Sequence, residues 1–168
     1  MKENPMREIR IEKITLNIGC GTDKNKLERA KRLLETLSEQ KVLTTLSRKR
    51  STFGVTKRKP IGVKVTLRKE NAKKFLRNVL SAVDNELKES QINDGNFSIG
   101  VKEYIDLPKI KYDPKLGIKG FDVLVSLRRP GYRIKRRKID KKRIPAKHII
   151  KKKDAIDFVK KFFGVEVE

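Results

Sequence analysis

Four segments of this chain alternate apolar and polar residues, and this alternation constrains the fold more than any other feature. The segments run from Ile14 to Ile18, from Ile61 to Leu67, from Phe97 to Val101 and from Phe121 to Leu127. A period of two residues is typical of a β-strand that buries one face and leaves the other polar. Ile9 and Ile11 alternate in the opposite phase from the first segment, which predicts a β-bulge near Glu12 and Lys13.

Other segments carry apolar residues at the spacing of amphipathic helices. One helix is predicted from about Asp23 to Glu39, a second from about Lys69 to Lys88, and a third around residues 155–162, ended by Gly164. A short strand is predicted over residues 42–46, a turn over 93–96 and a long loop over 105–120. We therefore expect an α+β protein: an antiparallel-rich sheet with helices packed on one face.

The chain divides by composition near Leu127. Residues 1–127 are expected to form the α+β domain, and residues 128–168 a basic extension whose C-terminal helix packs on the same domain. From Arg128 to Lys153 there are fourteen Lys or Arg residues and one acidic residue, Asp140.

The charge balance restricts what such a domain can do. The chain holds 44 Lys and Arg against 21 Asp and Glu, a formal net charge of +23, and self-repulsion of this size favours a polyanionic partner such as nucleic acid or an anionic membrane. Since no apolar run approaches the roughly 20 residues of a membrane-spanning helix, we expect no membrane partner. The N-terminus lacks the apolar core of a secretory signal, so we expect the protein in the cytoplasm.

Two basic tracts are candidates for phosphate binding. The first lies in Ser47–Leu67, where two basic clusters flank Phe53. Phe53 could stack on an unpaired base or pack beneath the loop, and the pattern favours neither. The second lies in the extension, where we expect contacts to a nucleic-acid backbone from Arg133, Lys135, Arg136, Arg137 and Lys138.

Polar residues of two strands form a third candidate. Thr15 and Asn17 on one strand, and Lys64 and Thr66 on another, should point away from the helix-covered face. If the strands adjoin, they present a polar surface that can hydrogen-bond ribose hydroxyls and phosphates. An ordinary solvated sheet face is the commoner explanation of such a pattern.

Catalytic or metal chemistry has little support. Gly19 and Gly21 lie between a strand and a helix, but Lys24 stands where a dinucleotide-binding turn needs a third glycine, which favours a simple tight turn. The chain has a single histidine and a single cysteine, so it has no metal-ligand spacing. We expect His148 to be exposed and Cys20 to be a small buried residue. Glu8 and Glu12 are expected to form surface ion pairs. We expect no cofactor, no metal and no small-molecule substrate.

Longer stretches resemble a known family. NPMREIRIEKITLNIG, SEQKVLTTLSRKRSTFGVTKRKPIGVKVTLR, FSIGVKEYIDLPKIKYD and GFDVLV are similar, in this order, to the "L-five" family of large-subunit ribosomal proteins that bind 5S rRNA. RRPGYRIKRRK and IPAKH look like the archaeal and eukaryotic branch. The resemblance implies 5S rRNA contacts for Asn17, Gln40, Phe53 and Thr66. Thr15 and Lys64 join this 5S rRNA set from the polar-face pattern.

The resemblance also implies that the loop over residues 47–59 extends toward the tRNA in the peptidyl site. Its cations would then contact the phosphates of the tRNA backbone: Arg48, Lys49, Arg50, Lys57, Arg58 and Lys59. The expected partners are 5S rRNA, 23S/28S-type rRNA, P-site tRNA and neighbouring ribosomal proteins. The sequence alone leaves two alternatives: an RNA-modifying or nucleotide-using enzyme built on the Gly19–Gly21 turn, and a general nucleic-acid-compacting protein.

Overall fold

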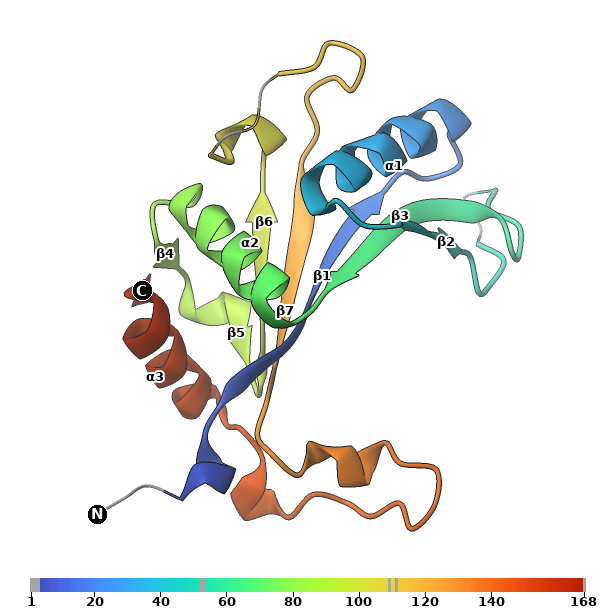
Figure 1. The fold of residues 1–168 in the computed structure, drawn as a ribbon. Helices are drawn as coiled ribbons and strands as arrows, with labels where there is room; N and C mark the ends of the chain where they lie inside the picture. Colours follow the sequence, from blue (N-terminus) through green and yellow to red (C-terminus); the bar gives the residue numbers. More distant parts are fainter. Residues whose placement is uncertain (1–3, 52–53, 109, 111, 168) are drawn as a thin grey trace.

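A computed structural model describes residues 4–51, 54–108, 110 and 112–167. Its centre is a six-stranded sheet in the order β2-β3-β1-β7-β6-β5, in which every neighbouring pair is antiparallel. Figure 1 shows α1 and α2 on the same side of this sheet, with α3 beside its β5 edge. The predicted α+β class, with an antiparallel sheet and helices on one face, is confirmed.

The strands of the large sheet are β1 (Arg10–Gly19), β2 (Leu43–Leu46), β3 (Pro60–Leu67), β5 (Ile92–Asn93), β6 (Asn96–Val101) and β7 (Phe121–Arg128). The helices are α1 (Lys24–Ser38), α2 (Lys69–Ser81) and α3 (Lys152–Phe163). Short 3-10 helices lie at Pro5–Arg7, Glu89–Gln91, Tyr104–Asp106, Tyr132–Lys135 and Ala146–His148. A second, two-stranded parallel sheet joins β4 (Glu86–Leu87) to β8 (Glu166–Val167).

The alternating residues of the four main strands form the core. Ile14 and Leu16 of β1 and Val123 of β7 are completely buried between the sheet and the helices. The register of β1 against β7 shifts between Ile11 and Lys13, so the predicted bulge is confirmed. Beside the bulge, Glu12 occupies a buried position in phase with Ile14 and Leu16, at the start of the core face.

The ends of α1 follow from local chemistry. The Asp23 carboxylate accepts hydrogen bonds from the backbone N–H groups of Asn25 (2.9 Å) and Lys26 (3.3 Å), which satisfies the free donors of the first turn. At the other end Glu39 adopts the left-handed conformation with φ 51°, and this stops the helix. Both boundaries match the prediction from the sequence.

The predicted length of the second helix is wrong. It was expected to reach Lys88, but α2 ends at Ser81 because Asp84 and Asn85 take positive φ angles of 50° and 59°. These residue types tolerate the left-handed region better than most. Leu87 is buried as its place on the apolar stripe suggested, but it reaches the core from β4.

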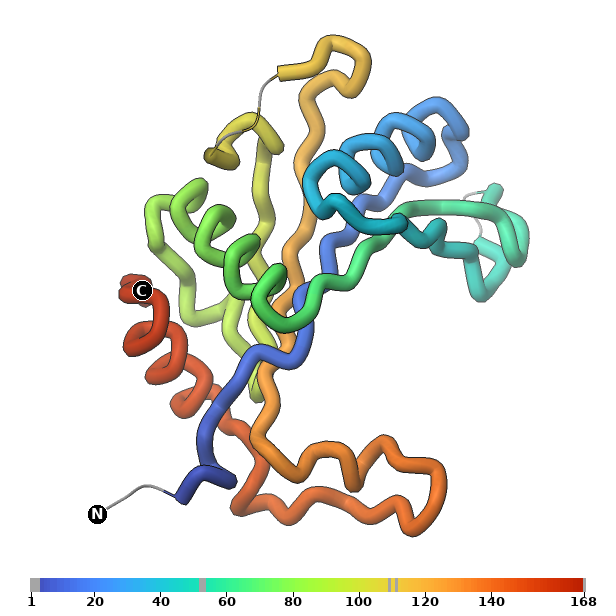
Figure 2. Tube along the Cα trace, in the orientation of Figure 1, coloured from blue at the N-terminus to red at the C-terminus, as the bar shows by residue number. Residues whose placement is uncertain are grey.

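The basic extension folds back onto the sheet domain. The tube in Figure 2 follows it from the end of β7 through a projecting loop and into α3, which ends at Gly164 in the left-handed conformation. The backbone N–H of Lys152 donates to the Asp94 carboxylate at 2.9 Å, which ties the start of α3 to the β5–β6 turn. Within the described residues no helix has the length and apolar character needed to cross a membrane.

Candidate nucleic-acid interface

The polar residues predicted to share a surface lie on adjacent strands. In the register of β1 and β3, Thr15 is opposite Thr66 and Asn17 is opposite Lys64. All four are half-buried and alternate with core residues of the opposite face. The two strands therefore adjoin, which is the condition for a shared polar surface, and the side chains are not enclosed beneath the helices.

The same surface continues across two further strands. On β7, Leu124 is opposite Thr15 and Asp122 is opposite Asn17, while Ser98 of β6 is opposite Leu124. We call this surface the uncovered face. Its described residues on β1, β3, β7 and β6 are Lys13, Thr15, Asn17, Lys64, Thr66, Asp122, Leu124, Ser126, Asn96 and Ser98.

Sequence reasoning missed the contribution of β6 and β7, although the same alternation marks their polar positions. The four predicted residues are polar, but the surface around them also holds apolar side chains. Leu124 is 44% exposed on the uncovered face, and Leu43, opposite Lys64, is 60% exposed on the edge strand β2. The Asp122 carboxylate adds one negative charge beside Asn17.

Gly62 allows the strands at this end of the sheet to approach closely. A Cβ atom on Gly62 would lie 2.7 Å from the Ile18 carbonyl oxygen and 3.0 Å from Thr45 Oγ1. A side chain at this position would therefore push β3 away from both of its neighbours.

Two other residues predicted to bind 5S rRNA lie apart from this cluster. Gln40 is half-buried in the connection between α1 and β2, where its backbone N–H donates to Ser38 Oγ at 3.3 Å. It therefore lies near the edge of the sheet rather than on the uncovered face. Phe53 is outside the described residues, so its stacking and packing alternatives both remain open.

The six cations predicted to bind tRNA belong to an extension of the β2–β3 hairpin. Ser47 N–H donates to the Lys59 carbonyl at 2.8 Å, Arg58 N–H donates to the Ser47 carbonyl at 2.9 Å, and Ser51 N–H donates to the Val55 carbonyl at 2.9 Å. These bonds hold the two limbs of the loop together. Five of the cations are exposed and Lys59 is half-buried. We call residues 47–59 the basic loop; it projects from the end of the sheet in Figure 1.

The basic loop and the basic extension lie at opposite ends of β1. Gly19, at one end, pairs with Gly62 near the root of the basic loop, and Arg10, at the other end, pairs with Arg128, where the extension starts. Ten strand residues span about 30 Å at roughly 3.3 Å each. The uncovered face therefore lies between two concentrations of positive charge.

Arg136 of the extension forms an ion pair with a residue of the sheet domain. Arg136 donates through both terminal nitrogens to the two carboxylate oxygens of Glu12, whose side chain is only 4% exposed. These hydrogen bonds hold the pKa of the Glu12 carboxyl below its usual value, against the opposing effect of burial, and they raise the pKa of Arg136. The surface ion pair predicted for Glu8 exists, with Arg10 at 2.6 Å, but the surface prediction for Glu12 is wrong.

The extension also packs through aromatic and polar contacts. Tyr132 Oη accepts from Ile150 N–H at 3.0 Å and donates to the His148 carbonyl at 3.1 Å. His148 Nε2 lies 2.8 Å from the Pro130 carbonyl, and its ring packs edge-on against Tyr132. The predicted exposure of His148 is therefore wrong: it is half-buried and holds two limbs of the extension together.

The glycine turn after β1 has the features of a structural turn. Gly21 has φ 64°, and Cys20 N–H donates to the Ile61 carbonyl at 2.9 Å. Cys20 is buried, as predicted, and burial raises the pKa of its thiol. Among the described residues no group of three His, Cys, Asp or Glu side chains could hold a metal ion.

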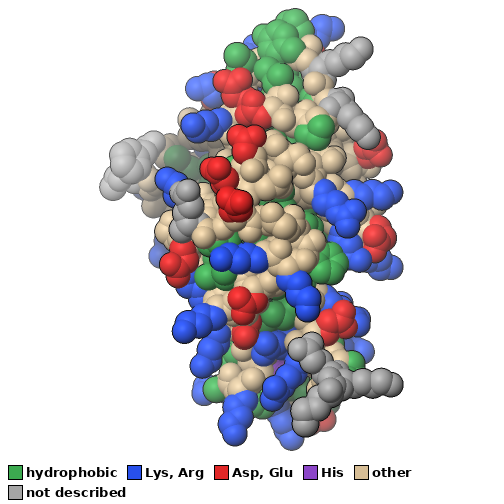
Figure 3. Space-filling model, turned by 90° about the vertical axis from the view of Figure 1, so that its left-hand side faces the viewer, with side chains coloured by type: hydrophobic (Ala, Val, Ile, Leu, Met, Phe, Trp, Pro, Cys, Tyr) green, Lys and Arg blue, Asp and Glu red, His purple; other side chains and the backbone are tan. Residues whose placement is uncertain are grey.

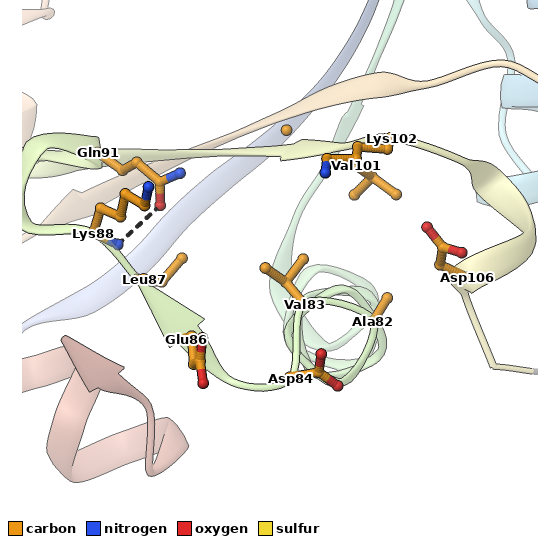
Figure 4. A pocket seen from close by; sticks show the side chains of 11 residues that line it. Ala82, Val83, Asp84, Glu86, Leu87, Lys88, Gln91, Val101, Lys102 and Asp106 are labelled. Atoms are coloured by element: carbon orange, nitrogen blue, oxygen red, sulfur yellow. Dashed lines mark hydrogen bonds between the residues drawn. The ribbon is translucent and has the colours of Figure 1, made fainter. Parts of the chain in front are cut away.

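Acidic side chains gather at the edge of the protein that lies away from the basic loop, near β4 and the end of α2. Figure 3 shows acidic side chains gathered over the middle and upper part of this edge, with Lys and Arg side chains beside and below them. A hollow of about 330 Å³ lies between the end of α2, β4 and β6, and Figure 4 shows the carboxylates of Asp84, Glu86 and Asp106 around it. Lys88 and Lys102 also line the hollow, so it lacks the excess of cations found at the two ends of the uncovered face, and we do not include it in the candidate interface.

An α+β sheet protein with a hydrogen-bonding face flanked by cations belongs to the class of basic proteins that work beside a polyanion. A profile described as ribosomal protein L5 matches residues 4–55, and one described as the ribosomal L5P family C-terminus matches residues 60–158. The chain belongs to the ribosomal protein L5 family. It is a structural, non-enzymatic protein of the large ribosomal subunit, bound to ribosomes in the cytoplasm.

Relatives named large ribosomal subunit protein uL5 match nearly the whole chain. The protein from Methanococcus vannielii is 44% identical over 99% of this chain and 94% of its own length. The one from Methanosphaera stadtmanae is 43% identical over 98% of this chain and 99% of its own length. The one from Sulfolobus acidocaldarius is 45% identical over 99% of this chain and 94% of its own length. All three organisms are archaea, which agrees with the branch that the C-terminal motifs resemble.

Proposed function

We propose that this protein binds 5S rRNA through its uncovered face, as part of the 5S rRNA particle in the central protuberance of the large subunit. The proposal is carried by one observation: Thr15, Asn17, Lys64 and Thr66 form a single hydrogen-bonding group across β1 and β3, on the side of the sheet opposite α1 and α2. Short polar side chains can approach ribose and phosphate oxygens closely, and the rigid sheet fixes their spacing.

Shape-matched docking explains how such a protein works without reaction chemistry. Hydrogen bonds from the uncovered face fix the register on a folded RNA segment, and the surrounding lysines and arginines supply most of the affinity. Membership in a family of structural ribosomal proteins supports this docking mechanism over the alternative of an enzyme.

We further propose that the basic loop contacts the tRNA in the peptidyl site. Its two limbs are held together by backbone hydrogen bonds and project beyond the sheet, so its cations can reach a second RNA while the uncovered face holds the first. Assembly beside 23S/28S-type rRNA and neighbouring ribosomal proteins would place both surfaces in contact with RNA.

The docking proposal is tested by removing two hydrogen-bonding side chains from the uncovered face. Asn17→Ala with Thr66→Ala should weaken binding to transcribed 5S rRNA by about 10- to 100-fold, since each positioned hydrogen bond contributes roughly 1 kcal/mol. Filter binding or calorimetry at fixed salt measures the change.

The matched control is Asn78→Ala, which removes an exposed asparagine from α2 on the helix-covered side. It should change the affinity less than twofold. Equal losses from the control and from the double variant would refute docking through the uncovered face.

A further inference from the structure

A groove of about 880 Å³ lies where the extension meets the sheet. Its floor includes Lys13, Ser126 and Asn96, which are paired across β1, β7 and β6. Two residues further along each strand, on the same side of the sheet, lie Thr15, Leu124 and Ser98. The groove is therefore continuous with the uncovered face.

The lining of the groove is strongly basic. It contains six cationic side chains: Lys13, Lys135, Arg136, Lys141, Lys142 and Arg143. Two carboxylates oppose them, and both are already engaged within the protein. Glu12 accepts from Arg136, and Asp94 accepts from the backbone of Lys152. The remaining lysines and Arg143 are available to an anionic ligand.

Internal contacts shape this groove in the protein itself. The Glu12–Arg136 pair fixes one side of the extension against the β1 bulge, and Tyr132 fixes the other side through its bonds to the His148 and Ile150 backbone. Arg129 adds an ion pair of 3.1 Å with Asp154 at the start of α3. A site that is ordered before binding loses less conformational entropy when the ligand arrives.

The chemistry of the lining favours a nucleic-acid strand over a small molecule. Sites for small ligands place only a few polar groups in their lining, whereas six of the sixteen described residues that line this groove are cationic. Several cations beside apolar side chains such as Ile144 and Ile149 suit successive phosphates of an RNA chain with its bases turned aside.

We propose that this groove binds the phosphodiester backbone of the same RNA that docks on the uncovered face, as that RNA continues past the end of β1. The inference rests on the proposed function and extends it. The site comprises Lys13, Lys135, Lys141, Lys142 and Arg143. Arg136 positions the extension through Glu12 and is not counted among the groups that bind phosphate.

The test compares two triple variants that remove equal charge. Lys135→Ala, Lys141→Ala and Lys142→Ala change the groove, whereas Lys74→Ala, Lys160→Ala and Lys161→Ala change exposed lysines of α2 and α3. Affinity for transcribed 5S rRNA is measured at several salt concentrations with the full-length protein, and phosphate ethylation interference maps the contacts. Circular dichroism checks that each variant is folded.

The groove triple should lower the slope of log K against log salt by about 2 to 3, because each lost phosphate contact removes roughly 0.7–0.9 from it. It should also abolish interference at a contiguous set of phosphates. The helix triple should lower the slope by less than about 1 and leave the interference pattern intact.

The outcomes separate the two proposals. Suppose that the unmodified protein binds 5S rRNA and that the Asn17/Thr66 double variant binds it more weakly. If both triple variants then change the salt slope equally, the groove proposal is wrong and the docking proposal stands. An acidic polypeptide as the natural occupant would give this result. If the unmodified protein does not bind 5S rRNA, both proposals fail.

Discussion

At the scale of single residues, Glu12 is a carboxylate at a core position of a strand. It is in phase with the buried residues Ile14 and Leu16, so its side chain faces the core beside the bulge between Ile11 and Lys13. A buried carboxylate requires a partner, and Arg136, 124 residues further along the chain, provides two hydrogen bonds. The pair connects the extension to the first strand.

This pairing predicts a pH dependence of stability. Arg136 lowers the pKa of Glu12 in the folded protein below its ordinary value of 4.5. A carboxyl whose folded pKa is depressed stabilises the protein above its unfolded pKa, and this contribution is lost as the pH falls through the folded value. The free energy of unfolding should therefore decline below about pH 4.5, and Glu12→Gln should reduce that decline.

Urea unfolding at pH 7 and pH 3 measures the effect. Glu12→Gln should lower the free energy of unfolding at pH 7 by about 1–3 kcal/mol, because the buried site loses a charge-assisted bond. Glu8→Gln, in an exposed pair with Arg10, is the control and should leave the free energy of unfolding nearly unchanged. Equal effects of the two variants would show that the extension is not held through Glu12.

At the scale of elements, the β2–β3 hairpin separates two functions within one structure. Its strands contribute Lys64 and Thr66 to the uncovered face, while its tip forms the basic loop. The loop is held together by its own backbone bonds, so side-chain changes at its exposed cations should leave the strands unchanged.

Replacing Arg48, Lys49 and Arg50 by alanine should therefore keep 5S rRNA affinity within about threefold and weaken tRNA contact by tenfold or more, since each lost phosphate contact removes part of the electrostatic term. Binding of P-site tRNA to reconstituted large subunits measures the second effect. The control variant replaces Arg29, Lys31 and Arg32, which are exposed on α1. If the loop variant instead loses 5S rRNA binding, the basic loop contacts 5S rRNA and the proposed tRNA contact is wrong.

At the scale of the whole molecule, charge is distributed unevenly. Cations lie at both ends of the uncovered face, and carboxylates gather around the hollow between α2, β4 and β6. An evenly charged basic protein would bind any polyanion from any side, whereas this arrangement orients the protein toward its RNA.

This distribution predicts strong salt dependence together with selectivity. If roughly 6–10 phosphates are contacted, affinity for 5S rRNA should fall by about 10³- to 10⁵-fold between 50 and 200 mM salt. Duplex DNA of equal length should compete poorly at the higher concentration, where positioned hydrogen bonds still discriminate. A flat salt response, or equal competition by DNA, would favour the general nucleic-acid-compacting alternative.

Much of the fold was predictable because local patterns controlled it. The two-residue periods predicted four buried strands, Asp23 and Glu39 bounded α1, and Asn93 to Asn96 marked the hairpin turn between β5 and β6. The end of α2 was not predictable from its apolar stripe, because Leu87 is buried equally well from a helix or from β4.

The candidate site was predictable only in part. Alternation placed Thr15, Asn17, Lys64 and Thr66 on one side of their strands, but only the sheet order could add β7 and β6, with Asp122, Leu124 and Ser98. Glu12 is in phase with the core residue Ile14, but its ion-pair partner Arg136 lies in a distant segment that local spacing does not reveal.

The sequence by itself determined which residues face the core and how much positive charge the protein carries, because periodicity and composition are local properties. Tertiary structure alone decided which cations remain available to RNA, because pairing with Glu12 removes Arg136 and the fold gathers the others along a groove. Long-range contacts cannot be read from local spacing, since they depend on how the strands are ordered in the sheet.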